Sequence, residues 1–355
     1  MQIIKRLKEL FGYSHWCLLA RKRFLAEISE HCHLENGTYY VVCGTREYLI
    51  KKGTPTDQLT SIGIPCNKGY VCVIVKSNTA SKVFCAQIMM STNEGYRYFN
   101  IKDKTTIKFF NADSEAYTYQ KAIQTFSPYW STTSISYTKE YSIERIIPSK
   151  PRNQWNLHDV YRVFYDVFER YIVYLGSTPK ESVNLSISDI FYNEFPEYTL
   201  FIQKLLKHLP CVQKGVTYVF SHCDLHLGNV LVDNNNVYLI DFEEAKNEVF
   251  YYDLFNIIYV EYNDNNNSCL LNDYLSFNTR MIDCFDRAFK TAGVNFIPHN
   301  YKQYLMVFIC IRLNNDIRIA KRKFNHEELA NRVHSYILSF DRLIDYIINF
   351  SNNED

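Results

Sequence analysis

The sequence lacks the cysteine patterns that mark a zinc ribbon or a disulfide framework. Eleven cysteines are present, but none forms a C-x-x-C pair and their spacing is irregular. An odd number of dispersed thiols suits a reducing compartment, so we expect a cytoplasmic protein.

Long apolar runs are also missing. The longest uninterrupted run, 304–311, is closed by Arg312 and falls well short of the roughly 20 residues that cross a bilayer. The N-terminal apolar stretch contains Gly12 and Ser14 and leads into three basic residues, 21–23, rather than into small ones. A signal peptide is therefore not expected, and the sequence predicts no transmembrane segment.

An excess of charge of either sign is absent as well. Lysine and arginine number 39 against 38 aspartates and glutamates, a formal net charge of +1, which supplies no strong positive field for a nucleic-acid backbone. We therefore expect no nucleic acid among the partners. With 355 residues, 47% of them hydrophobic and 22% charged, the chain can form two domains or one two-lobed unit with a buried core.

The N-terminal segment combines apolar and basic residues. Ile3, Leu7 and Leu10 recur at helical spacing, and Lys5 and Lys8 lie beside them. Such a helix suits two placements: on an anionic membrane surface, as a peripheral contact, or packed against its own domain, which is the commoner case.

The pattern of the chain changes near residue 150. Residues 30–110 hold short β-branched and aromatic runs between Gly, Pro, Asn or Asp, which is typical of an antiparallel sheet. Longer periodic segments follow, and they predict helices at 155–175, 187–209, 251–262, 271–292, 301–319 and 326–350. One island, 217–244, interrupts them with two short strands around the asparagines 234–236, as in a hairpin.

This order predicts an α+β protein of two lobes, an N-terminal antiparallel sheet lobe and a larger helical C-terminal lobe. Pro148 and Pro151 bracket the joint between the two patterns.

The island carries the residue types that phosphoryl transfer needs. Its sequence reads H-x-D-L-H-x-G-N at 222–229, L-I-D-F at 239–242 and Y-D-L at 252–254. Transfer from a nucleotide requires a carboxylate that accepts the proton of the attacking hydroxyl, and oxygen ligands for metal ions on the phosphates. Asp224 supplies the first, and Asn229 and Asp241, which the hairpin returns toward the loop, supply the second.

The island resembles the aminoglycoside phosphotransferase and choline kinase branch of the protein-kinase-like fold, whose pattern is similar to H-x-D-L-H-x-x-N, I-D-F-E and Y-D-L. The resemblance is close over residues 218–254 and covers the rest of the chain only in architecture. It implies that Asp224 is the catalytic base, that His222 packs the catalytic loop and bonds its backbone, and that Asp253 anchors that loop.

The resemblance also implies ATP as the phosphoryl donor and Mg²⁺ as the metal, bound by Asn229 and Asp241. Cys223 stands where many relatives have glycine, and it could be a site of oxidation. A metal-binding alternative exists at the same loop, because alternate residues of an extended segment point the same way and His222 and His226 could hold zinc or iron with the carboxylate between them. That alternative gives Asn229 no role.

The implied fold needs a strand lysine for the phosphates and a helix glutamate that pairs with it. The run T-T-I-K-F-F offers Lys108, and the helix that opens at 111–114 offers Glu115. Lys102 is the alternative phosphate lysine, but Lys108 is favoured because 102–104 then forms a turn between strands of similar length. The alternative for Glu115 is an exposed carboxylate on the helix face.

Two further segments complete the predicted nucleotide site. Residues 91–95 would form the loop over the phosphates, with Gly95 as its one glycine. The run E-Y-S-I-E-R-I-I would be the last strand and the hinge that binds adenine through its backbone near Ile146. Lobe motion about this hinge is expected to close the site against water.

This assignment divides the chain into an extension of unknown role (1–78), a kinase-like N-lobe (79–148), and a helical C-lobe with the catalytic loop and metal-binding hairpin (149–355). The extension exceeds what a minimal kinase-like lobe needs. It could cap the lobe, extend its sheet or dock to a partner.

The predicted function is that of an ATP-dependent, Mg²⁺-requiring kinase acting on a hydroxyl of a small molecule, such as a sugar, an amino alcohol or an aminoglycoside-like compound. Cues to the acceptor conflict, because the acidic residues at 243, 244, 248 and 261 suit a cationic amine and the basic residues within 312–323 suit a phosphorylated compound. A protein-directed kinase and a nucleotide-binding pseudokinase scaffold are the alternatives.

Overall fold

The structure is a computed structural model, and it describes residues 2–30, 33–44, 46–61, 64, 71–76, 84–92, 95–183, 196–207, 216–233 and 236–350. The chain forms two units. One contains Met1–Gln154 and Val230–Glu243, and the other contains Trp155–Asn229 and Glu244–Asp355.

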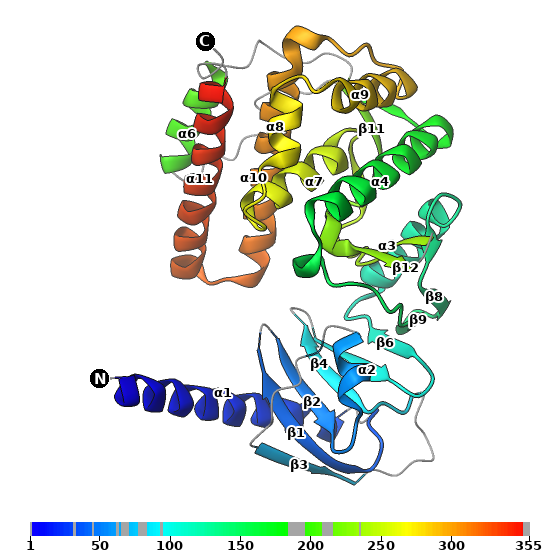
Figure 1. Cartoon of the computed structure of the whole chain (residues 1–355), viewed down its shortest axis with the longest axis vertical. Coiled ribbons are helices and arrows are strands. Elements are labelled where there is room, and N and C mark those ends of the chain that lie inside the picture. The colour runs from blue at the N-terminus through cyan, green and yellow to red at the C-terminus, as the bar shows by residue number, and fades with distance from the viewer. Residues whose placement is uncertain are drawn as a thin grey trace. The chain divides into compact units, whose positions relative to one another are not determined.

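The first unit is built on an eight-stranded sheet in the order β3-β1-β2-β4-β5-β6-β9-β8 (Figure 1). Every neighbouring pair is antiparallel. The strands are β1 (Gly37–Cys43), β2 (Glu47–Lys51), β3 (Val71–Val75), β4 (Ile88–Thr92), β5 (Gly95–Asn100), β6 (Thr105–Phe109), β8 (Ser134–Tyr137) and β9 (Tyr141–Arg145). The antiparallel sheet predicted from the β-branched runs is confirmed.

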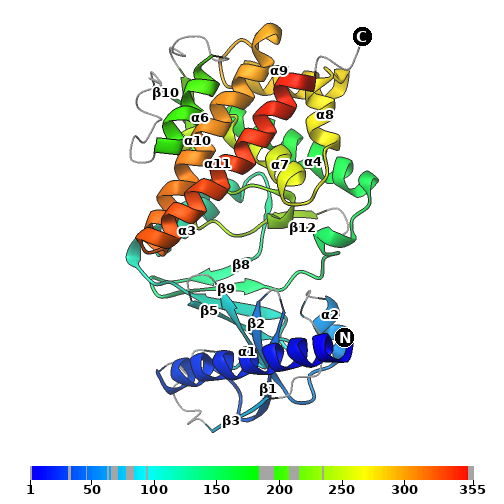
Figure 2. The same ribbon diagram turned by 90° about the vertical axis from the view of Figure 1, so that its left-hand side faces the viewer.

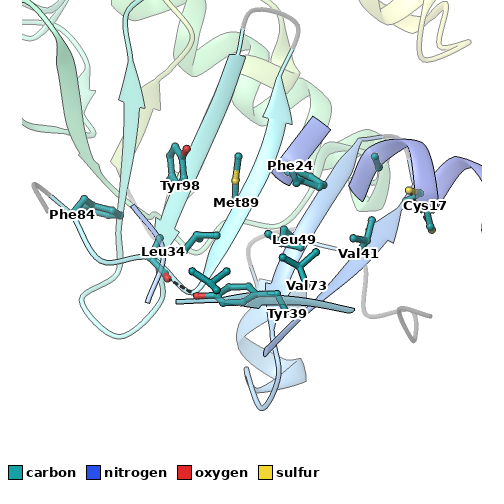
Figure 3. Close-up of a cluster of buried hydrophobic side chains, with 14 of the residues drawn as sticks. Cys17, Phe24, Leu34, Tyr39, Val41, Leu49, Val73, Phe84, Met89 and Tyr98 are labelled. Atoms are coloured by element: carbon teal, nitrogen blue, oxygen red, sulfur yellow. Dashed lines mark hydrogen bonds between the residues drawn. The ribbon is translucent and has the colours of Figure 1, made fainter. Parts of the chain in front are cut away.

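Helix α1 (Gln2–Glu30) lies along one face of this sheet (Figure 2). Cys17, Ala20 and Phe24 recur on one side of the helix and are fully buried, in a cluster with Val41 and Leu49 of the sheet (Figure 3). The helix thus packs against its own domain. The described residues give no support to a peripheral membrane contact, and none of the described helices is long and apolar enough to span a membrane.

The opposite face of the sheet carries a second apolar cluster and two helices. Val42, Ile50 and Ile88 pack there with Leu59 of α2 (Thr56–Ser61). Helix α3 (Asp113–Phe126) buries Tyr119, whose hydroxyl donates to a carboxylate of strand β9. Alternation along each strand therefore separates residues that face α1 from residues that face the other way.

The predicted hairpin forms in the same unit. Strands β12 (Val230–Asp233) and β13 (Asn236–Leu239) pair antiparallel, and the short strand β7 (Ser131–Thr132) pairs parallel to β13. The turn residues 234–235 lie outside the described part of the chain.

The N-terminal residues continue the sheet of this unit. Strand β2 pairs with β4, with Tyr48 opposite Met90 and Ile50 opposite Ile88, so β1, β2 and β3 are added at that edge. The predicted boundary at residue 78 lies outside the described residues, and the three-part division of the chain stays a prediction.

The second unit is mostly helical (Figures 1 and 2). Its helices are α4 (Leu157–Ser177), α6 (Pro196–Leu206), α7 (Tyr252–Asn263), α8 (Cys269–Leu275), α9 (Thr279–Thr291), α10 (Tyr301–Lys323) and α11 (His326–Asn349). Short 3₁₀ helices span Leu227–Asn229 and Pro298–Asn300, and a third, Arg152–Gln154, ends the first part of the other unit. A three-stranded sheet joins β10 (Glu181–Val183), β11 (Val216–Ser221) and β14 (Lys246–Val249).

Aromatic rings fill the centre of the helical unit. Phe255 of α7 stacks on Phe285 of α9 with ring centroids 4.9 Å apart, and Tyr274 of α8 lies 4.7 Å from Phe285. All three are buried. Packing of these rings holds α7 in place, and α7 in turn carries Asp253, which bonds the loop that follows β11.

The α+β class, with an antiparallel sheet and a helical region, is confirmed, but one predicted helix is wrong. Residues 271–292 form parts of two helices, because Phe277 adopts a left-handed backbone (φ 57°) and places its ring 4.2 Å from that of Tyr301. Asn278 then starts α9 by accepting hydrogen bonds from two backbone N–H groups. The predicted helix at 187–209 is described only from Pro196 to Leu206.

Candidate active site

The candidate catalytic loop leaves the end of β11 and is fixed by Asp253 in the first turn of α7. Oδ2 of this carboxylate accepts from the His222 backbone N–H (2.8 Å), and Oδ1 accepts from the Cys223 N–H (2.9 Å). Asp253 is fully buried. Burial raises its pKa to about 6, although the nearby His222 and both backbone hydrogen bonds act to lower it. The start of the loop is thus tied to a helix at the centre of the second unit.

The backbone conformation of Cys223 shows why a glycine suits this position. Its φ is 63°, in the left-handed region that glycine adopts without steric cost. The side chain is 5% exposed, and Sγ lies 3.8 Å from the carbonyl oxygen of Lys246. Burial raises the pKa of the thiol well above its ordinary value, so the thiol stays protonated. A buried, protonated thiol is a poor target for oxidation, contrary to the expectation from sequence.

Asp224 and Asn229 lie together at the two ends of this loop. Nδ2 of Asn229 donates to the carbonyl oxygen of Asp224 (2.9 Å) and to its Oδ2 (3.2 Å). Both amide hydrogens are therefore used within the loop, which leaves Oδ1 of Asn229 as the atom that could face a cation. The side chain of Asp224 is 34% exposed, so its carboxylate is accessible.

Arg312 of α10 is a contact of Asp224 that sequence reasoning did not assign to the loop. Its Nη1 lies 3.5 Å from Oδ1 of Asp224 and donates to Oδ1 of Asn256 (2.8 Å). Nδ2 of Asn256 in turn donates to the carbonyl oxygen of Leu225 (3.0 Å). Nε of Arg312 forms an ion pair with Asp316 at 3.0 Å. The sequence signal was a charged pair spaced i, i+4 directly after the longest apolar run, which indicates buried charges.

The two histidines of the loop serve its internal geometry. His222 is fully buried, and its Nδ1 accepts from the backbone N–H of Asp224 (3.4 Å). His226 accepts from the Gly228 N–H through Nδ1 (3.1 Å) and lies 3.8 Å from Oδ2 of Asp224 through Nε2. Within the described ranges, no group of three or more His, Cys, Asp or Glu side chains is placed to hold a metal ion. The zinc or iron alternative therefore finds no support.

The predicted phosphate lysine lies in the first unit, on the central strand β6. Lys108 is 8% exposed, and its Nζ pairs with Oε1 of Glu115 at 2.8 Å. Oε2 of Glu115 accepts from the backbone N–H of Asn111 (2.9 Å), which fixes the carboxylate at the start of α3. The side chain of Lys102 is 70% exposed and pairs with Glu35 at 2.9 Å. The structure thus brings the preferred lysine and the predicted glutamate together.

Asp241 and Glu243 follow strand β13 in the same unit. Asp241 has a left-handed φ of 67° and an exposed side chain. Phe242 is buried and stacks on Phe126 of α3, with centroids 5.9 Å apart and an interplanar angle of 14°. Glu243 forms a second ion pair with Lys108. From the sequence, Glu243 is recognisable only as one member of an acidic stretch.

The other two predicted nucleotide contacts are Gly95 and Ile146. Gly95 begins β5 with φ 147°, and residues 93–94 of the predicted phosphate loop lie outside the described part of the chain. Ile146 packs in the apolar cluster opposite α1, and its backbone N–H donates to the carbonyl oxygen of Lys104 (2.8 Å). That N–H is therefore committed within the protein.

A cavity of about 680 Å³ in the first unit is lined in part by Gly95, but its lining does not include Lys108, Glu115 or Glu243. Its lining includes Glu27 of α1 and the rings of Tyr98, Phe109 and Tyr141. These rings belong to the face of the sheet that packs against α1, whereas Lys108 alternates with Phe109 and faces the other side. The cavity is not the site of the Lys108 ion pairs.

Most of the acidic residues that suggested a cationic acceptor have structural roles. Glu248 and Glu261 are buried, and Glu261 accepts from the side-chain amides of Asn265 and Asn267. Glu243 is paired with Lys108, as described above. Three of the four acidic groups are thus committed to structure, so they do not indicate a cationic acceptor.

A comparison with protein families matches the central part of the chain to a phosphotransferase family. The model of the phosphotransferase enzyme family matches residues 189–277, which contain the loop, the hairpin and helices α7 and α8. No curated protein matches the chain. The resemblance to phosphotransferases is confirmed over these residues.

Several solved structures are similar to larger parts of the chain. A choline kinase, LicA from Streptococcus pneumoniae, is 11% identical with a TM-score of 0.45, covering 71% of this chain and 90% of that one. A macrolide 2′-phosphotransferase type I is 11% identical with a TM-score of 0.45, covering 70% and 86%. An amicoumacin kinase in complex with AMP-PNP, Ca²⁺ and Ami is 12% identical with a TM-score of 0.41, covering 68% and 83%.

Proposed function

We propose that this protein is an ATP-dependent, Mg²⁺-requiring phosphotransferase that phosphorylates a hydroxyl of a small molecule. The observation that carries the proposal is the pairing of Asp224 with Asn229 on a loop whose backbone is bound by Asp253. A partly exposed carboxylate held beside an amide oxygen donor suits a catalytic base next to a metal ligand. The family match over the same residues supports this reading.

The proposed reaction gives roles to the other predicted site residues as well. Lys108, oriented by Glu115, would bind the phosphates of ATP. Oδ1 of Asn229 and the exposed carboxylate of Asp241 are hard oxygen donors of the kind that Mg²⁺ prefers. When bound, Mg²⁺ would neutralise charge on the phosphates.

Asp224 would orient the acceptor hydroxyl and take its proton. The acceptor oxygen forms a bond to the γ-phosphorus while the bond from that phosphorus to the β–γ bridging oxygen breaks, and ADP leaves with that oxygen. The hydroxyl proton passes to the carboxylate of Asp224. Arg312 at 3.5 Å and Asn229 at 3.2 Å keep that carboxylate in position.

The test is transfer of label from ATP to fractions of a small-molecule extract. Wild type is compared with Asp224→Asn and with Asp286→Asn, an exposed residue of α9 that serves as the matched control. We expect a labelled product with wild type and the control and none with Asp224→Asn. Binding of ADP should be unchanged in Asp224→Asn, because the replaced carboxylate acts on the acceptor.

Other outcomes would redirect or refute the proposal. Label on polypeptide alone, lost in Asp224→Asn, would show a protein-directed kinase. Binding of ADP without any Asp224-dependent transfer would favour a pseudokinase scaffold. Full turnover by Asp224→Asn would show that the catalytic base is misassigned.

A further inference from the structure

Arg97 lies directly beside the phosphate lysine of the proposed site. It sits in β5 opposite Lys108 of β6 in the antiparallel register, where paired side chains project from the same face. Its neighbours in the strand, Tyr96 and Tyr98, pack toward α1. Arg97 therefore faces away from α1, on the side that carries the Lys108 ion pairs.

The guanidinium of Arg97 has donors to spare. Its side chain is 20% exposed, and its one ion pair among the described residues joins Nη1 to Oε2 of Glu144 at 3.4 Å. An arginine offers five N–H donors in a planar fork. A structural pairing with Glu144 alone does not account for them, since the other oxygen of Glu144 already accepts from Tyr119 (2.9 Å).

The surroundings of Arg97 contain the acidic groups of the nucleotide site. Burial acts to lower the pKa of Arg97, but the charges of Glu144, Asp241 and Glu243 outweigh it and raise that pKa. The guanidinium is thus close enough to Asp241, the proposed metal ligand, and to Glu243, a partner of Lys108, for their charges to act on it.

Lys108 by itself has little capacity left for a triphosphate. Its ammonium group has three N–H donors, and it is already paired with Glu115 and Glu243. A second cation on the same face would supply the missing donors. Arginine is suited to this because its fork matches two phosphate oxygens at once.

We propose that Arg97 is a second phosphate-binding residue of the nucleotide site, which contacts the phosphates of ATP or ADP beside Lys108. This inference rests on the proposed function, because it takes the ligand of Lys108 to be a nucleotide. In the structure, Glu144 contacts the guanidinium through one ion pair of 3.4 Å. On binding, the remaining N–H groups donate to phosphate oxygens.

The experiment measures the affinity of ADP and of adenosine by calorimetry in the same Mg²⁺ buffer. The proteins are wild type, Arg97→Gln, Arg97→Lys and the control Arg145→Gln, an exposed arginine of strand β9, which pairs with β6. Loss of a charged hydrogen-bond donor to phosphate should weaken ADP binding by about tenfold or more in Arg97→Gln. Adenosine binding should not change, and Arg97→Lys should recover part of the ADP affinity.

A second variant separates phosphate binding from a purely structural role. Glu144→Gln removes the carboxylate that competes for the guanidinium, so it should leave ADP affinity unchanged or increase it. If the Arg97–Glu144 pair only stabilises the sheet, both variants should weaken ADP and adenosine alike. If Arg97→Gln does not fold, the ADP and adenosine affinities of Glu144→Gln alone distinguish the two roles.

Three results would overturn the inference. The first is an ADP affinity of folded Arg97→Gln within twofold of wild type. The second is a parallel loss of ADP and adenosine binding in Arg97→Gln or in Glu144→Gln. The third is a wild-type protein that binds no ADP, which would overturn the proposed function as well, whereas the first two leave that function intact.

Discussion

Replacing Arg312 with methionine tests the charge cluster behind the candidate catalytic loop. The ion pair between Arg312 and Asp316 is largely buried, with side-chain exposures of 18% and 11%. Methionine fills much of the same space but leaves the Asp316 carboxylate without its ion-pair partner. Breaking a buried pair from one side costs about 3–5 kcal/mol of the free energy of unfolding, so we expect a loss of that size at neutral pH.

The double variant Arg312→Met with Asp316→Leu separates the ion pair from simple packing. Removing both charges should recover about 2–4 kcal/mol, because buried ion pairs are often replaceable by apolar residues. Urea unfolding followed by tryptophan fluorescence gives both free energies. The control Arg162→Met, an exposed residue of α4, should stay within about 0.5 kcal/mol of wild type.

The same pair predicts a pH dependence. Burial raises the pKa of Asp316 above its ordinary 3.8, although Arg312 opposes the shift. A carboxyl whose pKa is raised on folding stabilises the fold below its unfolded pKa, and this contribution is lost as the pH rises through its folded pKa. Without Arg312 that loss grows, so the deficit of Arg312→Met should be smaller at mildly acidic pH than at neutral pH. A double variant no more stable than Arg312→Met, or a deficit independent of pH, would refute the reasoning.

Two further predictions concern single residues. Cys223→Val should destabilise the protein by about 2 kcal/mol or more, because valine is strained at this left-handed φ. Cys223→Gly should cost only about 1 kcal/mol, because glycine adopts this φ without strain and loses only the buried side chain and the lower chain entropy of the unfolded state. Equal losses in chemical denaturation would argue against strain. The carboxyl of Glu35 is buried enough to disfavour its charge, yet its bonds to Lys51 and Lys102 lower its pKa from 4.5 to about 2. Its stabilisation is therefore present above 4.5 and lost as the pH falls toward 2, and Glu35→Gln should remove about 1 kcal/mol of this acid dependence. A profile unchanged from wild type, or the same change in the exposed control Glu140→Gln, would contradict the assignment.

The local part of the site was predictable because its residues are close in sequence. The spacing of Asp224 and Asn229 sets them five residues apart on one turn of chain, and their side chains do meet. Lys108 and Glu115 were also found, since a strand followed at once by a helix returns the chain to the strand end. The choice of Lys108 over Lys102 followed from strand length, and the structure shows Lys102 in an exposed turn.

The long-range contacts were not predictable from one sequence. Arg312 approaches Asp224 from a helix far along the chain, and nothing local to either residue encodes that approach. The break at Phe277 was missed because its neighbours continue an apolar helical pattern, and the left-handed turn depends on a ring contact with Tyr301.

By itself the sequence determined which side chains are available for the proposed phosphoryl transfer, together with the alternation of strands and helices that presents them. Local spacing suffices for this, because neighbours along the chain cannot be far apart. Only the tertiary structure decided which charges neutralise one another. The pairing of Lys108 with Glu243, of Arg97 with Glu144 and of Arg312 with Asp224 depends on burial and on the register between distant segments.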